Sequence, residues 1–330
     1  MEEFHESIKL GTYTENKTLR DKRDLLTKEL KEKLPDDTPK FEKLDQGSYA
    51  MNTGINPEGG DYDIDVGIVF ECTKKDFKNP VDLKKIVRDA LKISSRTPEI
   101  RRPCITVTYI KDGETDYHVD MAIYVKRSDE KGYDLAKGKE NSGEEFCVWE
   151  QADPKGLVQW VADVCDDAKE GEQYRRCVRY LKAWKEHKFS SGEPISVGLT
   201  VAAGKHFKAN IDKYEGPDDL QALRHIVNKM YSNFETVTHD EFGEGERLVV
   251  KLPVTPKTDL FDKMSNNHME TFEKRLKKLL DAIDNATAEE VPEKACEYLQ
   301  KQFGEEFKIP EKSETAKKTR SSIASSGMSA

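Results

Sequence analysis

Residues 61–70 alternate acidic and apolar side chains, and they constrain the fold more than any other stretch of the chain. The apolar side chains fall at every second position, a period typical of a strand with one buried face. The other face of this strand carries Asp61, Asp63 and Asp65. Carboxylates crowded on one patch repel one another unless a cation neutralises them. The pattern therefore predicts a divalent metal ion beside the strand.

Two other interpretations of these aspartates are a calcium-binding loop and a solvated strand face. A calcium loop that began at Asp61 would need glycine at its sixth position and glutamate at its twelfth, where the chain has Val66 and Cys72. The calcium loop is excluded, and the solvated face stays open as the alternative.

A second predicted strand, residues 117–125, places Asp120 on the face opposite its apolar side chains. We expect Asp63, Asp65 and Asp120 to meet at one point when the two strands lie close together. Two magnesium ions held by such a set would suit nucleotidyl transfer, because they activate a hydroxyl and offset the charge of a leaving pyrophosphate.

The tripeptide Gln46, Gly47 and Ser48 comes shortly before the aspartate strand. Glycine lets the backbone approach a phosphate, and the serine hydroxyl can donate a hydrogen bond to a phosphate oxygen. A Gly-Ser pair alone is common, so its weight comes from its position ahead of the aspartates.

The composition narrows the class of protein. A length of 330 residues with 36% apolar content favours about two domains. No run approaches the roughly 18 apolar residues of a membrane helix, and the acidic start differs from a signal peptide, so we expect a cytoplasmic protein without a membrane partner. The six scattered cysteines predict reduced thiols rather than disulfides or a zinc site. A net charge of -9 argues against long nucleic acid as a partner but allows small nucleotides.

Periodicity divides the chain into four parts: an N-terminal helical segment at 1–34 that packs on the core, a sheet domain at 35–150, a helical domain at 151–310 and a flexible tail at 311–330. The predicted helices cover residues 15–34, 81–93, 172–187, 217–234 and 266–283, with others opening at Asp153 and at Pro194. The remaining predicted strands cover residues 40–44, 104–110 and 246–252, with a hairpin turn at Asp112 and Gly113.

The helix at 172–187 carries a basic stripe of Arg175, Arg179 and Lys182. Such a stripe is more often a solvated helix face than a binding site. Ser196 opens the next predicted helix, where it fits either a capping residue or a phosphate ligand.

Several of these motifs occur together in one known family, in this order: Gln46-Gly47-Ser48, Asp63-x-Asp65, Asp120, the Leu-Lys-Ala-Trp segment that contains Lys182, and Pro194-Ile195-Ser196. Over about residues 15 to 305, the chain resembles the polymerase-beta-like nucleotidyltransferases. More closely it is similar to the bacterial CD-NTases, relatives of the animal cyclic GMP-AMP synthase and oligoadenylate synthase. The resemblance implies an α+β fold with a palm domain, a mixed sheet flanked by helices, followed by a helical C-terminal domain.

The resemblance also implies a function. Asp63, Asp65 and Asp120 would hold two Mg²⁺ ions, with Mn²⁺ as an alternative, and would be the catalytic residues. The nucleotide-binding residues it implies are Gln46, Gly47, Ser48, Lys182 and Ser196. Such enzymes join ribonucleoside triphosphates, here with ATP as an expected substrate and the second base open, into a cyclic di- or trinucleotide for anti-phage (CBASS) signalling.

The family further implies a downstream effector that senses the cyclic nucleotide, and a ubiquitin-transferase-like partner that conjugates the C-terminal tail. The sequence lacks the Cys/His insertion of the animal DNA sensor, so we do not expect activation by long DNA. A transferase that extends an RNA end or modifies a small acceptor is the alternative enzyme, and a non-catalytic scaffold is the alternative outside enzymes. The scaffold is disfavoured because all three carboxylates are present.

Overall fold

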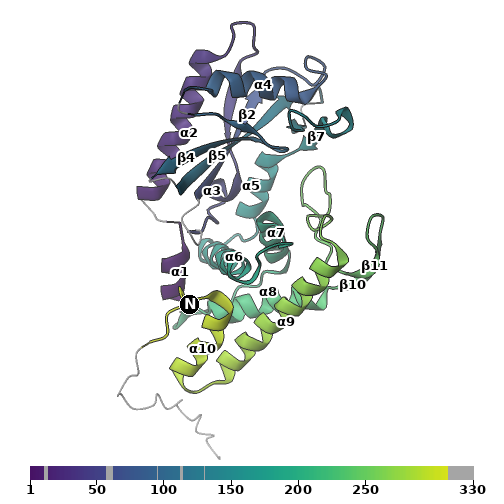
Figure 1. The fold of residues 1–330 in the computed structure, drawn as a ribbon. Helices are drawn as coiled ribbons and strands as arrows, with labels where there is room; N and C mark the ends of the chain where they lie inside the picture. The colour runs from purple at the N-terminus through teal and green to yellow at the C-terminus, as the bar shows by residue number, and fades with distance from the viewer. Residues whose placement is uncertain (11–13, 57–61, 95, 112–113, 130, 311–330) are drawn as a thin grey trace, which may run out of the picture.

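The aspartate-bearing strand β2 (Tyr62–Phe70) lies inside a seven-stranded mixed sheet, the upper part of the molecule in Figure 1. It pairs antiparallel with β1 (Phe41–Asp45) and parallel with β5 (Glu114–Lys126). The computed structural model describes residues 1–310 except 11–13, 57–61, 95, 112–113 and 130. The other strands of the sheet are β3 (Glu99–Ile100), β4 (Ile105–Lys111), β6 (Tyr133–Lys137) and β7 (Val148–Ala152).

Two helices, α2 (Thr14–Lys33) and α4 (Pro80–Leu91), cover one face of this sheet. The α4 helix begins where the sequence signals it, because Asn79 accepts a hydrogen bond from the Val81 amide at 2.9 Å and Pro80 occupies the first turn. Buried side chains of both helices pack on the apolar side of β2 and β5. The period-two pattern of the aspartate strand therefore directs its apolar face to the core.

Helices make up most of the lower part of the molecule in Figure 1. They are α5 (Pro154–Ala162), α6 (Ala168–Lys188), α7 (Ser196–His206), α8 (Asp219–Ser232), α9 (Asn266–Ala288) and α10 (Pro292–Phe303). Asp153 caps α5 by accepting from the Gly156 amide at 2.8 Å. The apolar side chains of α6 at helical spacing, Tyr174, Cys177, Val178, Leu181 and Trp184, are fully buried in the core of these helices. The α+β class and the mixed sheet predicted from the sequence are thus confirmed.

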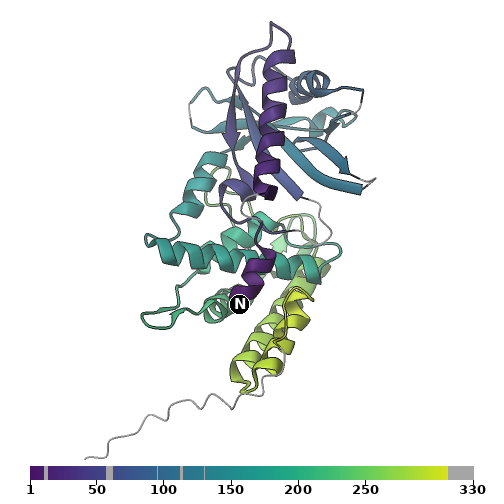
Figure 2. The same ribbon diagram turned by 90° about the vertical axis from the view of Figure 1, so that its left-hand side faces the viewer.

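The first 34 residues hold two helices rather than one. The short α1 (Glu2–Ile8) precedes α2 and packs on the helical part of the molecule. The ring of Phe4 stacks on that of Tyr180, with centroids 5.9 Å apart, and its centroid lies 5.0 Å from that of Phe303. Figure 2 shows α1 beside the lower helices and α2 along the sheet. The N-terminal segment therefore packs on both parts of the molecule.

Several elements differ from the sequence prediction. The strand predicted at 246–252 is instead the hairpin partner β11 (Gly243–Arg247) of β10 (Glu235–His239). The strands β3, β6, β7 and β10 and the helix α10 have no counterpart in the prediction. The turn predicted at Asp112 and Gly113, and the tail from 311 onward, lie outside the described residues.

The six cysteines are free. Within the described ranges, no helix combines the length and the apolar character that a membrane span requires.

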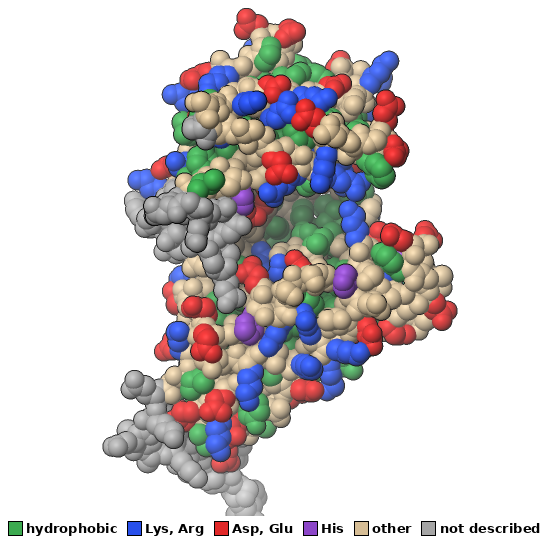
Figure 3. Space-filling model, viewed as in Figure 1, with side chains coloured by type: hydrophobic (Ala, Val, Ile, Leu, Met, Phe, Trp, Pro, Cys, Tyr) green, Lys and Arg blue, Asp and Glu red, His purple; other side chains and the backbone are tan. Residues whose placement is uncertain are grey.

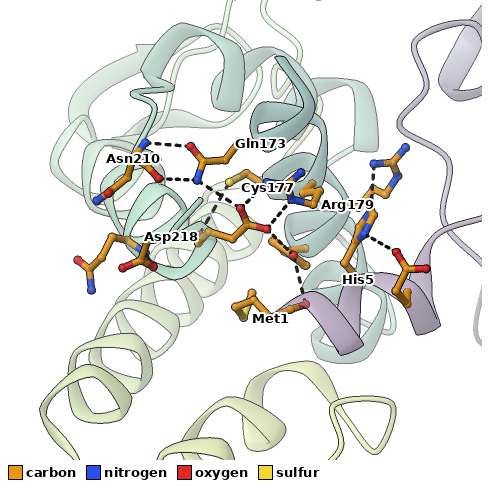
Figure 4. A network of polar contacts seen from close by, with 12 residues as sticks. Met1, His5, Gln173, Cys177, Arg179, Asn210 and Asp218 are labelled. Carbon is orange, nitrogen blue, oxygen red and sulfur yellow. Dashed lines mark hydrogen bonds and ion pairs between the residues drawn. The ribbon is translucent and has the colours of Figure 1, made fainter. Parts of the chain in front are cut away.

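A buried polar network joins α6 to α8 and to the N-terminus (Figure 4). The Asp219 carboxylate accepts from the Arg176 Nε at 2.7 Å and from the Tyr180 hydroxyl at 2.8 Å. Gln173 exchanges two hydrogen bonds of 2.9 Å with the backbone of Asn210. Because the Tyr180 hydroxyl also lies 3.3 Å from the Met1 carbonyl, α1 is tied into this network.

Replacing Asp219 with Ala should destabilise the protein by about 3 kcal/mol, because it leaves the Arg176 guanidinium without its partner in a largely buried place. The neighbouring Asp218 caps α8 by accepting from the Gln221 amide at 3.0 Å, and Asp218→Ala should cost only about 1 kcal/mol. Urea unfolding followed by circular dichroism compares the two. Equal losses of unfolding free energy in the two variants would contradict a larger stabilisation by the buried network than by the helix cap.

Candidate active site

A pocket of about 470 Å³ lies between the sheet and the helical part. Figure 3 shows the molecule hollowed at this level. One wall comes from β2 and the short helix α3 (Gly47–Ala50), and the other from α5, α6 and α7. The predicted site residues that line it are Gln46, Gly47, Ser48, Asp63, Asp65, Lys182 and Ser196. Segments far apart in the sequence thus supply opposite walls of one pocket.

Asp120 lies next to this wall, on the strand beside the aspartates. Asp63 and Asp65 share one face of β2, and Asp65 is directly opposite Asp120 in the parallel β2–β5 pair. The Thr106 hydroxyl donates to the Asp120 carboxylate at 2.6 Å. The three carboxylates therefore lie on one face of the sheet.

These carboxylates influence one another electrostatically. Burial first, and then the charges of Asp63 and Asp120, raise the pKa of Asp65 to about 7, while Lys182 acts in the opposite direction. Within the part of the chain that the structure describes, no three Asp, Glu, His or Cys side chains are gathered closely enough to form a metal site as they stand. Carboxylate oxygens suit a hard cation such as Mg²⁺. The donor chemistry fits, and repulsion among the carboxylates opposes their closer approach without a cation.

Gly47 brings the backbone against the aspartates. Its φ of +71° is in the left-handed region, and a Cβ added to it would lie 2.0 Å from the Asp65 carboxylate oxygen. Only glycine permits so close an approach. The Gln46 side chain accepts from the Tyr124 hydroxyl at 2.9 Å, and both residues line the same pocket as the aspartates.

Lys182 and Ser196 face the aspartates from the helical wall. Lys182 is buried, and its Nζ donates to the Thr53 carbonyl at 2.8 Å and to the Thr53 hydroxyl at 3.2 Å. Burial lowers the pKa of Lys182 to about 8, and the carboxylate of Asp63 acts against that shift. Ser196 is the first residue of α7, and the capping position belongs to Ile195, whose side chain makes no capping hydrogen bond. The capping interpretation of Ser196 is therefore wrong.

The sequence interpretation missed two further residues that line the pocket, Lys185 and Tyr124. The Lys185 Nζ donates to the Ser196 hydroxyl at 3.3 Å. Its position three residues after Lys182 places both on one helix face, a signal that was available in the sequence. The alternation along residues 117–125 already places Tyr124 on the face of Asp120, but no role in the site was assigned to it.

The basic stripe of α6 is not a solvated face along its length. Arg179 donates to the carbonyls of Asn52 and Gly54, and Lys182 is buried against Thr53. The helix therefore uses these two cations to hold the segment that follows α3.

Comparisons with known proteins agree with this arrangement. Residues 39–124, which include β1, β2 and most of β5, match the family model of the nucleotidyltransferase domain of DncV-like cyclic GMP-AMP synthases. A cyclic GMP-AMP synthase of Escherichia albertii is 26% identical over 178 residues, 50% of this chain and 37% of the relative. One from Escherichia coli strain TW11681 is 25% identical over 186 residues, 55% of this chain and again 37% of the relative. The match thus spans little more than a third of these curated relatives.

Solved structures share the fold along most of the chain. Vibrio cholerae DncV with 3'-deoxy ATP gives a TM-score of 0.69 at 17% identity and covers 92% of each chain. Escherichia coli DncV with 3'-deoxy GTP gives 0.66 at 17% identity, covering 91% of this chain and 93% of the other. The matched domain and the shared fold agree with the resemblance drawn from the motifs: residues 39–124 are similar to the nucleotidyltransferase domain of DncV-like cyclic GMP-AMP synthases, and the fold is that of the DncV structures.

Proposed function

We propose that the chain is a metal-dependent synthase that joins ribonucleoside triphosphates into a cyclic di- or trinucleotide. The observation that carries the proposal is that Asp63 and Asp65 line one pocket together with Lys182 and Ser196, while Asp120 shares the aspartates' face of the sheet beside Asp65 without lining the pocket itself. Carboxylates for a metal and cations for phosphates on facing walls are what transfer of a nucleotidyl group requires.

In this proposal Asp63, Asp65 and Asp120 hold Mg²⁺, or Mn²⁺ in its place. Two such ions would activate the attacking hydroxyl and offset the charge of the leaving pyrophosphate. Gly47 and Ser48 offer backbone and hydroxyl donors to the phosphates. Lys182, Lys185 and Ser196 bind the same triphosphate from the helical wall, so the nucleotide bridges both parts of the molecule.

A second, larger pocket supports the joining of two nucleotides. It has about 740 Å³ and shares Tyr124, Pro154 and Leu157 with the first pocket. Each of the two volumes is in the range of small-molecule sites. The Vibrio cholerae DncV has been solved with the linear intermediate 5' pppA(3',5')pG, and a stepwise path with ATP as one substrate would suit this chain too.

Extension of an RNA end, or of a small acceptor, is the alternative activity. Purified protein incubated with Mg²⁺ and labelled triphosphates, then treated with phosphatase, separates the two. A phosphatase-resistant product supports synthesis of a cyclic nucleotide. A lengthened RNA would instead show that the protein extends RNA ends. Through the family resemblance, the proposal also includes a role in anti-phage defence and a cytoplasmic location. It further includes an effector that senses the cyclic nucleotide and a ubiquitin-transferase-like partner that conjugates the tail.

The double substitution of Asp63 and Asp65 to Asn should abolish product, with a loss on the order of a thousandfold or more, because it removes the carboxylates proposed to hold the metal. Without added metal, the thermal midpoint should be no lower than that of the parent, since crowded like charges do not stabilise the fold. Product is measured by chromatography and stability by calorimetry. Glu71→Gln, which changes an exposed carboxylate just after β2, is the control. Product from the double variant would refute the site.

Metal-free protein should lose stability as the pH rises from about 4 through 7. The pKa of Asp65 is raised from 3.8 to about 7, so the folded state keeps a proton that the unfolded chain releases in this range. Asp65→Asn should lack this pH-dependent loss of stability. As the pH rises from about 4 to 7, the free energy of unfolding of Asp65→Asn should therefore increase relative to that of the parent, by at most a few kcal/mol. Urea unfolding in a chelator at several pH values tests this. If the unfolding free energies of the two proteins changed with pH in parallel, the folded state would not retain the expected proton on Asp65.

Triphosphate binding should weaken above about pH 8, where the buried Lys182 of the free protein loses its proton. The Kd of a nonhydrolysable analogue should rise by up to about tenfold per pH unit in the parent and stay nearly level in Lys182→Gln. Lys169→Gln, at the exposed start of α6, is the matched control and should follow the parent. Calorimetric titration gives the Kd values. A Lys182→Gln profile as steep as the parent's would show that another group titrates.

A further inference from the structure

The segment of residues 51–56 directly follows the α3 turn, and its backbone is hydrogen-bonded to that turn. The Thr53 amide donates to the Ser48 carbonyl at 2.9 Å, and the Asn52 amide donates to the Tyr49 carbonyl at 3.1 Å. Any shift of this segment must therefore move or release Gly47 and Ser48, which line the pocket and are proposed to contact the phosphates.

Two cations of α6 hold three consecutive carbonyls of this segment. Arg179 donates through Nη2 to the Asn52 carbonyl at 2.5 Å and through Nε to the Gly54 carbonyl at 3.2 Å. Lys182 donates to the carbonyl between them, that of Thr53. Hydrogen bonds from charged donors are stronger than neutral ones, so this is a firm attachment. Burial, and next the charge of Arg175, lower the pKa of Arg179 to about 10, which still leaves the guanidinium charged at neutral pH.

The N-terminal helix closes the attachment from the other side. The Asn56 amide donates to the Ile8 carbonyl at 2.7 Å, and Lys9 forms an isolated bridge with Ile55. The third arm of Arg179, its Nη1, lies 3.3 Å from the His5 Nε2 on α1 (Figure 4). Burial and Arg179 lower the pKa of His5 to about 4, so its neutral ring can accept this hydrogen bond.

We propose that Arg179 is a positioning residue that holds the Gly47–Ser48 turn at the distance from α6 at which both can bind one triphosphate. Arg179 is not among the residues that line the 470 Å³ pocket, so it acts through the segment of residues 51–56. Because α3 packs on β2 whereas α1 and α6 pack in the helical core, the attachment joins the two walls of the pocket. The proposed benefit for catalysis rests on the proposed function, but the attachment itself does not.

A preorganised turn lowers the cost of binding, because the ligand does not have to order it. Loss of Arg179 should therefore raise the KM for triphosphate more than it lowers kcat, since a bound nucleotide can draw the turn back into place. A purely structural arginine would instead lower the stability of both parts of the molecule without a selective effect on KM.

The experiment compares the parent with Arg179→Met, Arg179→Lys and the control Arg175→Met. Arg175 is one turn earlier on α6, and its change removes the same charge without removing a described hydrogen bond to Asn52 or Gly54. Hydrogen exchange is measured first without nucleotide, for the amides of residues 51–53 and for those of β2 and α6. Binding of a nonhydrolysable triphosphate and the kinetics of product formation follow.

In Arg179→Met, the amides of residues 51–53 should exchange about tenfold faster, while those of β2 and α6 keep the parent's rates. The triphosphate Kd and KM should rise by about five- to tenfold with kcat within about threefold, and saturating nucleotide should restore protection. Arg179→Lys should fall between parent and Met variant, and it carries the test if the Met variant does not fold. Arg175→Met should match the parent.

The proposal is overturned if protection of residues 51–53 is unchanged, if it is lost equally in Arg175→Met, or if exchange rises throughout both parts of the molecule. It is also overturned if protection is lost but triphosphate affinity is not. The nucleotide-free exchange data are independent of the reaction. A parent protein that protects this segment but binds no triphosphate would therefore refute the proposed function while leaving the attachment in place.

Discussion

The parallel pairing of β2 with β5 is the constraint on which the site depends. Its register sets Asp65 opposite Asp120, and the alternation of side chains along β2 then brings Asp63 to the same face. A shift of one residue would send Asp120 to the apolar side of the sheet. The register is held because the alternate residues of both strands, among them Ile64 and Val119, are completely buried under α2 and α4. Packing on one face of the sheet thus determines the chemistry available on the other.

The second wall of the pocket depends on one helix with two different faces. On one face of α6, Trp184 and its apolar neighbours form the centre of the helical core. On the other, Arg179, Lys182 and Lys185 point toward the α3 turn, the segment after it and Ser196. Since the core fixes the rotation of the helix, the cations have no freedom to turn away. The rigid helix can therefore position the cations both for their hydrogen bonds to the backbone after α3 and for the proposed binding of phosphate.

Burial disfavours the charged forms of Asp65 and Lys182 in the pocket, and a bound ligand of opposite charge would favour them again. Asp65 has a raised pKa and Lys182 a lowered one, mainly through burial in both cases. A metal ion would favour the charged carboxylate, and a phosphate would favour the charged lysine. Opposite shifts on facing walls are typical of functional sites. This local arrangement explains how a chain with a net charge of -9 can be suited to bind an anionic substrate.

Much of this protein was determined by the sequence alone: the strands that bear Asp63, Asp65 and Asp120, the helix that bears Lys182, and the turn at Gly47 all follow from local periodicity and backbone preference. Local patterns could not reveal that Lys182 donates to the Thr53 carbonyl or that Arg179 donates to the carbonyls of Asn52 and Gly54. Nor could they reveal that α1 packs in the helical core and not on the sheet. Each of these depends on contacts between residues more than a hundred positions apart in the chain. Only the tertiary structure decided them, because hydrogen bonding and burial at such separations depend on how the two parts pack, which no period of two or 3.6 residues encodes.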